Sequence, residues 1–186
     1  MTNTFPIQIR HATTDDARML SELGARTFYD TFAKDNTPEN IAAYLKTSFS
    51  PEIQFHELAE SDNIFLIAEA DTKPSGYVQL ILNSTEESLH GTRFLEIRRI
   101  YAVQDQIGKG VGKMLMMASI QEARQRGCDS IWLGVWEKNP RAIDFYKKWG
   151  FQEVGTHTFN VGDDPQRDFI MELTLTQETF TGEING

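Results

Sequence analysis

The sequence predicts an α/β fold: a mixed, largely antiparallel, seven-stranded sheet with a parallel central pair, flanked by helices. Segments rich in strand formers alternate with segments of helical spacing along the chain. Two strand-like segments, 63–70 and 76–82, enclose a turn and predict an antiparallel hairpin. The strand–helix–strand order between residues 94 and 135 requires a crossover helix, and therefore one parallel pair.

Start signals define the elements of the first half. The short alternating segment 7–11 predicts a first strand, and the cap and acids at 13–16 predict a helix that ends at about Phe32. Proline at the first helical position predicts two further helices, at 38–47 and 51–59. The second half follows the hairpin and a polar loop at 83–92. Its predicted elements are a strand at 94–103, a helix at 110–126, a strand at 130–135, a helix at 139–149, and strands at 151–159 and 169–175.

Length and composition predict one domain over residues 1–186, with a core of about 7–175 and a flexible tail at 176–186. The chain is 40% hydrophobic, which suffices for a packed core. Eighteen basic and 27 acidic residues give a net charge of −9. A negative field repels phosphate backbones, so we expect no nucleic-acid partner, and it favours cationic ligands.

Cysteine and hydropathy indicate the compartment. Cys128 is the single cysteine, which excludes an internal disulfide and a cysteine-based metal site. Residues 1–6 lack the pattern of a signal peptide, and the apolar runs are much shorter than the roughly 20 residues that span a bilayer. The four histidines (11, 56, 90, 157) lack ligand spacing. We therefore expect a soluble, cytoplasmic protein with no membrane partner and no metal.

A glycine-rich turn, residues 108–112, joins a predicted strand to a predicted helix. Its glycines let the backbone approach a ligand, and the unpaired N–H groups of the helix start attract an anion. Neither the dinucleotide fingerprint nor the P-loop fits, because Lys113, Ile107 and Met114 occupy required positions. The alternative is a flexible turn without a ligand.

The strand before this turn has an irregular pattern. Apolar residues stand at 95 and 97, then at 100 and 102, so the alternation slips at Arg98–Arg99. Such a slip predicts a β-bulge, whose unpaired backbone groups a ligand can bind. The alternative is a noisy strand.

The last predicted helix begins with Asn139 as N-cap and Pro140 at its first position. Ala142, Phe145, Tyr146 and Trp149 share one of its faces. By itself this face favours core packing over catalysis.

In this order, the three motifs resemble the GCN5-related N-acetyltransferase (GNAT) superfamily over about residues 7–175. The family's loop pattern is [Gln/Arg]-x-x-Gly-x-[Gly/Ala], and Gly110 and Gly112 match its glycine positions. Ile107 stands at the Gln/Arg position. Because the loop binds mainly through backbone N–H groups, we expect this departure to weaken the site rather than abolish it.

The chain also resembles PaiA-type polyamine N-acetyltransferases, above all in the string Ile-Trp-Leu-Gly-Val-Trp-Glu-Lys-Asn at 131–139. The other matching stretches are 27–32, 38–40 with 44–45, 95–97 with 99–101, 142–143 with 145–148, and 149–151. The resemblance implies acetyl-CoA as co-substrate, direct transfer in a ternary complex, spermidine or spermine as acceptor, and a homodimer as an option.

The resemblance also implies the cofactor-binding residues. The acetyl-CoA pyrophosphate would lie on Gly108, Lys109, Gly110, Val111, Gly112 and Lys113. The pantetheine arm would follow Ile100, Tyr101 and Ala102, with a backbone N–H near Ile100 polarising the thioester carbonyl. Asn139 would hold the pantetheine or a water, Tyr146 would lie beside the thiol, and Lys148 would meet a CoA phosphate.

Two residues are candidates for the chemistry. Glu96, fourteen residues before Gly110, is the candidate general base; the alternative is a surface glutamate or an ion pair with Arg98. Tyr146 is the candidate general acid toward the leaving sulfur; the alternative is a core tyrosine. Tyr29, Asp30 and Glu96 would line a cationic groove for the acceptor.

Other acceptors fit the same family: a peptide N-terminus, a lysine or an amino-sugar. In a different class, the chain would be a CoA-sensing regulatory protein without fast chemistry. The presence of both Glu96 and Tyr146 argues against that second class.

Overall fold

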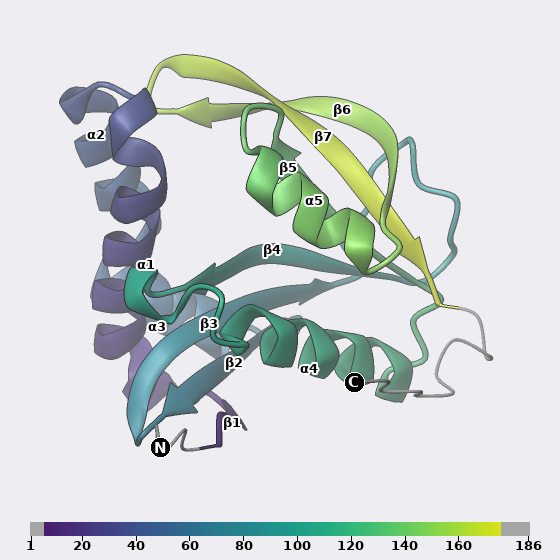
Figure 1. Ribbon diagram of the computed structural model, residues 1–186, viewed down its shortest axis with the longest axis horizontal. Helices are drawn as coiled ribbons and strands as arrows, with labels where there is room; N and C mark the ends of the chain where they lie inside the picture. Colours follow the sequence, from purple (N-terminus) through teal and green to yellow (C-terminus); the bar gives the residue numbers. More distant parts are fainter. Residues whose placement is uncertain (1–5, 176–186) are drawn as a thin grey trace.

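The structure is a computed structural model that describes residues 6–175. It forms one seven-stranded sheet in the order β1-β2-β3-β4-β5-β7-β6 (Figure 1). Within the described residues β4 and β5 are the parallel pair and all other neighbours are antiparallel, which confirms the predicted sheet. The strands are β1 (Gln8–His11), β2 (Asn63–Ala70), β3 (Lys73–Leu82), β4 (Phe94–Ala102), β5 (Ser130–Trp136), β6 (Gln152–Val161) and β7 (Asp164–Thr174).

Helices cover both faces of the β2–β4 half of the sheet. The strand β2 shows why: Ile64 and Leu66 pack in the core under α4, while Phe65 and Ile67 pack on the opposite face against α1. In Figure 1 the helices α1–α3 stand together on one side, and α4 and α5 lie on the other. The helices are α1 (Ala17–Phe32), α2 (Pro38–Ser48), α3 (Pro51–Ala59), α4 (Val111–Gln125) and α5 (Pro140–Lys148), with short 3-10 turns at Thr14–Asp16, Ala33–Asp35 and Gln104–Gln106.

The predicted helix starts are confirmed by their caps. The Thr37 hydroxyl accepts a hydrogen bond from the backbone N–H of Asn40, and the Ser50 hydroxyl accepts one from Ile53. At the first helix the structure differs, because the acids at 14–16 form a 3-10 turn and α1 begins only at Ala17.

The last two strands are longer than predicted, and they meet at a turn of residues 162 and 163. The first half of β7, residues 164–168, is polar, so apolar alternation did not reveal it. Backbone pairing between β6 and β7 extends there to Val161 and Asp164. Val161 is buried against Phe28 and Ile41, which fastens the turn end of this pair to α1 and α2.

The sheet opens between β4 and β5. Their pairing runs from Phe94 with Ser130 to Glu96 with Trp132 and stops there. In Figure 1, β6 and β7 rise away from β4. The predicted bulge is also confirmed: on β3, Leu80 pairs with Ile97 and Gln79 with Arg99, which leaves Arg98 as the additional residue on β4.

Among residues 6–175, no helix has the length and apolarity needed to cross a membrane. The tail predicted at 176–186 lies outside the described residues.

Candidate active site

A cavity of about 990 Å³ lies where β4 and β5 diverge. Segments from the β4 bulge, the turn before α4, the end of β5 and the helix α5 line it, together with parts of α1, α2, β6 and β7. It brings together ten of the residues singled out from the sequence. They are Glu96, Ile100, Tyr101, Ala102, Gly108, Gly110, Gly112, Lys113, Asn139 and Tyr146.

Three predicted cofactor residues are not among the residues that line the cavity. Val111 has a fully buried side chain in the core, so only its backbone can serve a ligand at this turn. Lys109 and Lys148 are exposed, Lys109 in the turn and Lys148 at the end of α5.

The two acceptor residues predicted on α1 also lie outside the cavity. Phe28, Thr31 and Phe32 line it, whereas Tyr29 and Asp30 are exposed and do not. Successive helical residues are turned by about 100°, so these two side chains cannot share the face of Phe28 and Phe32. The side chain of Tyr29 is 55% exposed.

The glycine turn is built for close approach of an anion. Gly108 and Gly110 have φ angles of +81° and +95°, which residues with a Cβ rarely adopt. Gly110 is the N-cap of α4 and supplies no side chain to the first N–H groups of the helix. These groups remain available for hydrogen bonds to a phosphate. The turn therefore fits the diphosphate of a CoA ester.

Replacing Gly110 with alanine is expected to weaken CoA binding roughly 5- to 30-fold, because a Cβ at this φ costs about 1–2 kcal/mol and displaces the turn. Calorimetric titration with CoA measures the change. Gly150→Ala is the matched control, because Gly150 also has a positive φ, of +91°, but does not line the cavity. Equal affinity of the two variants would contradict the expectation.

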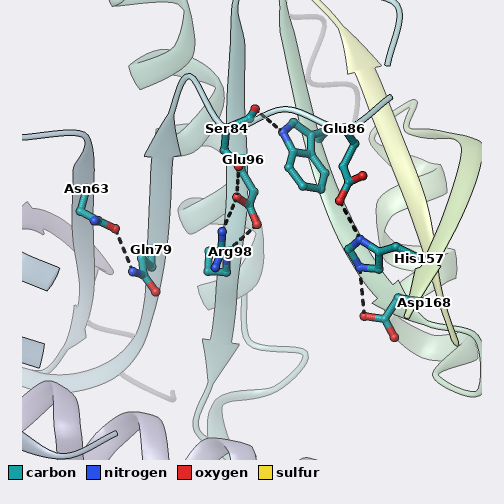
Figure 2. A network of polar contacts seen from close by, with 9 residues as sticks. Asn63, Gln79, Ser84, Glu86, Glu96, Arg98, His157 and Asp168 are labelled. Carbon is teal, nitrogen blue, oxygen red and sulfur yellow. Dashed lines mark hydrogen bonds and ion pairs between the residues drawn. The ribbon is translucent and has the colours of Figure 1, made fainter. Parts of the chain in front are cut away.

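Glu96 is buried in the cavity wall and bonded at both carboxylate oxygens (Figure 2). Arg98 donates from Nε to Oε1 at 2.5 Å and from Nη2 to Oε2 at 2.9 Å, and Ser84 donates to Oε2 at 2.5 Å. The bonded carboxylate raises the pKa of Arg98. Glu96 thus forms the ion pair with Arg98 that was the alternative to a role as general base, and it also lies in the cavity wall, where a base would act. Trp132 donates to the Ser84 carbonyl oxygen at 2.8 Å and fixes this loop over the parallel pair.

Tyr146 lies on α5 and is 8% exposed. Its ring packs against Phe145 and Phe151. Burial raises the pKa of its hydroxyl, so the group keeps its proton at neutral pH. Asn139 caps the same helix by accepting the N–H of Ala142 at 3.2 Å, as predicted. Asn139 is therefore both the N-cap of α5 and part of the cavity wall.

Glu86, His157 and Asp168 also line the cavity, and the sequence analysis assigned none of them to the site. Asp168 on β7 is 8% exposed, and its Oδ1 has no hydrogen-bond partner. Its Oδ2 lies 3.9 Å from Nε2 of His157 on β6, whose Nδ1 lies 3.0 Å from Oε1 of Glu86. Burial raises the pKa of Asp168 to about 6. The one sequence signal was an acid directly before the apolar run at 169–171.

Replacing Asp168 with asparagine is expected to stabilise the fold at pH 8 by roughly 1–3 kcal/mol. The raised pKa means that the folded state binds more protons than the unfolded chain between about pH 4 and 6, so wild-type stability falls as the pH rises through this window. The variant lacks the buried charge, and its advantage disappears below pH 4. Urea unfolding at pH 3.5 and pH 8 measures both values; the same difference at the two pH values would contradict the expectation.

Within residues 6–175, no group of three or more His, Cys, Asp or Glu side chains is arranged so that it could hold a metal ion.

Comparison with known proteins agrees with this geometry. Residues 25–151 match the model of the acetyltransferase (GNAT) family. A protein of Lactobacillus delbrueckii subsp. lactis, named as an uncharacterized N-acetyltransferase, is 33% identical over 153 residues, which cover 82% of this chain and 88% of that protein. Spermidine N(1)-acetyltransferase of Thermoplasma acidophilum is 26% identical over 89% of this chain and 96% of its own.

The fold is likewise shared with a solved structure. The crystal structure of the PaiA N-acetyltransferase from Thermoplasma acidophilum in complex with coenzyme A aligns with a TM-score of 0.75 and 24% identity. The alignment covers 92% of this chain and all of that one. With the family match and the cavity at the glycine turn, these findings show that the chain belongs to the acetyltransferase (GNAT) family and is an acetyl-CoA-dependent N-acetyltransferase.

Proposed function

We propose that this enzyme acetylates a primary amine of a polyamine such as spermidine or spermine, with acetyl-CoA and the amine bound together. The observation that carries the proposal is the single cavity that reaches from the glycine turn to a wall bearing Glu86, Glu96 and Asp168. Carboxylates in such a wall attract a cationic acceptor. The net charge of −9 and the likeness to a spermidine acetyltransferase give further support.

The cofactor end of the cavity is assigned to the turn and to β4. The backbone N–H groups of residues 108–113 would hold the diphosphate, with Lys113 beside them in the lining. Beyond Glu96, β4 has no β5 partner, which supports the proposal that backbone groups of Ile100 and Ala102 would bond the pantetheine arm. Asn139 lines the cavity near the start of α5 and would hold the same arm or a water.

The chemistry follows from the groups around the cavity. The ammonium of the acceptor gives a proton to Glu96, directly or through water, and the neutral nitrogen then forms a bond to the thioester carbon. The N–H of Ile100 stabilises the negative charge that develops on the carbonyl oxygen. When the carbon–sulfur bond breaks, Tyr146 gives its proton to the sulfur. The nitrogen, now bonded to the acetyl carbon, loses its extra proton, which returns through water to the Tyr146 phenolate and leaves a neutral amide.

The proposal includes a cytoplasmic location and leaves room for a homodimer. A lone, half-buried Cys128 suits a reducing compartment. Light scattering of the purified protein at several concentrations measures the state of assembly.

Thiol release from acetyl-CoA over a panel of amines tests the acceptor. Spermidine and spermine are expected to give the highest kcat/KM, above glucosamine, a peptide with a free N-terminus and an N-terminally blocked lysine peptide. If one of the last three compounds gives the highest kcat/KM, the acceptor belongs to that class and is not a polyamine. Calorimetric binding of acetyl-CoA without release on any amine would instead indicate a CoA sensor.

A further inference from the structure

Three polar residues from distant segments meet on one wall of the cavity. Glu86 belongs to the loop after β3, His157 to β6 and Asp168 to β7. Figure 2 shows them in a row, with Asp168 nearest one ring nitrogen of His157 and Glu86 nearest the other. All three line the same cavity as Glu96.

The Asp168 carboxylate is the unusual member of this row. The residue is 8% exposed, and its Oδ1 makes no hydrogen bond. Buried carboxylates are nearly always bonded, so a buried oxygen without a partner, on a residue that lines a cavity, indicates a partner that arrives with the ligand. The basic group that faces it, His157 Nε2, is 3.9 Å from Oδ2, which is too far for a hydrogen bond.

The charges around Asp168 favour a cation. His157 faces it from β6, Glu86 lies behind His157, and Glu137, which follows β5, adds a second negative charge. Glu137 is itself paired with Arg167 at 2.6 Å. Two carboxylates against one imidazole make the row a site for positive charge, and the Asp168 carboxylate still lacks a hydrogen-bond donor at Oδ1.

Space and apolar surface adjoin this row. Gly134 lies beneath His157, and a Cβ there would come within 2.8 Å of Nε2, so the glycine gives the imidazole its place. Phe32, Trp136 and Phe159 line the same cavity. Such rings pack against methylene groups and tolerate a nearby ammonium. An aliphatic chain with a cationic end fits these surroundings.

We propose that Glu86, His157 and Asp168 form a subsite for a second ammonium group of the acceptor, distinct from the amine that is acetylated. Asp168 is the charge partner, and Glu86, which is bonded to His157, adds negative charge to the row. The inference rests on the proposed function and makes it more specific: the enzyme selects acceptors with two amines joined by a short aliphatic chain.

The subsite has a defined pH range. Asp168 binds an ammonium only as the carboxylate, and burial raises its pKa to about 6. The subsite is therefore competent above pH 6, and KM for a diamine rises as the pH falls through 6. The titratable groups that face Asp168 are His157 and Glu137, with Glu86 behind His157.

Asp168→Asn tests the subsite with two acceptors of equal length, 1,4-diaminobutane and n-pentylamine. Loss of one charge-assisted hydrogen bond is expected to raise KM for 1,4-diaminobutane about 10- to 100-fold. KM for n-pentylamine, which has no second ammonium, should stay unchanged. Glu153→Gln is the matched control, because it removes an exposed β6 acid outside the cavity and should alter neither value.

Calorimetric titration of 1,4-diaminobutane into CoA-saturated protein measures diamine binding without turnover. Binding by wild type and its loss in Asp168→Asn supports the subsite, even if no amine on the panel is acetylated and the proposed function fails. Acetylation with the same diamine-to-monoamine KM ratio in both proteins overturns the subsite and leaves the proposed function standing. Glu86→Gln is a second variant, expected to raise KM for the diamine while kcat is kept.

Discussion

Replacing Tyr146 with phenylalanine is expected to lower kcat about 10²–10⁴-fold while the Kd for acetyl-CoA changes less than about threefold. The hydroxyl is the one group that the variant loses, and its buried, protonated state suits it to protonate the leaving sulfur. Without that proton, the thiolate leaves against a higher barrier. Steady-state thiol release and calorimetric CoA titration separate the two quantities.

Tyr77→Phe is the matched control for this variant. Tyr77 is fully buried, its hydroxyl has no hydrogen-bond partner, and it does not line the cavity. Its loss should leave kcat unchanged. If Tyr146→Phe also turns over at the wild-type rate, the Tyr146 hydroxyl takes no part in proton transfer and Tyr146 is a core residue.

Replacing Glu96 with glutamine is expected to lower kcat/KM about 10²–10⁴-fold and to flatten its dependence on pH. The amide keeps the size of the side chain and a hydrogen-bond acceptor for Ser84 or Arg98, but it cannot take a proton from the ammonium. A pH series of kcat/KM with a polyamine acceptor measures the effect. An unchanged profile would mean that another group is the base.

Loss of the ion pair with Arg98 is a second explanation for a loss of activity in Glu96→Gln, and a control variant can test it. Arg98→Gln breaks the pair but leaves the Glu96 carboxylate with its Ser84 hydrogen bond. If Glu96 is the base, this variant should retain most of the activity. Equal losses in the two variants would instead indicate that the pair only holds the bulge in shape.

Local signals made much of the fold predictable. Caps such as Thr37 and Asn139 act within four residues, and the bulge at Arg98 follows from one slipped alternation in a single strand. The cavity residues around β4 and the glycine turn were predictable for the same reason, because each belongs to a contiguous motif.

The acceptor side of the cavity could not be predicted in this way. Glu86, His157 and Asp168 meet only through the pairing of β6 with β7 and the course of the loop after β3, and no short segment contains two of them. Tyr29 and Asp30 were expected in the cavity because the family resemblance includes their segment. The side chains that reach the cavity are instead those on the face of α1 that carries Phe28 and Phe32, and the resemblance does not specify that face.

The junction of the last two strands with α1 and α2 has a consequence for how such an enzyme diversifies. Val161 packs at that junction, and the two strands that meet there carry His157 and Asp168 but no residue of the glycine turn. Substitutions in β6 and β7 can therefore change acceptor preference while the glycine turn before α4 stays unchanged.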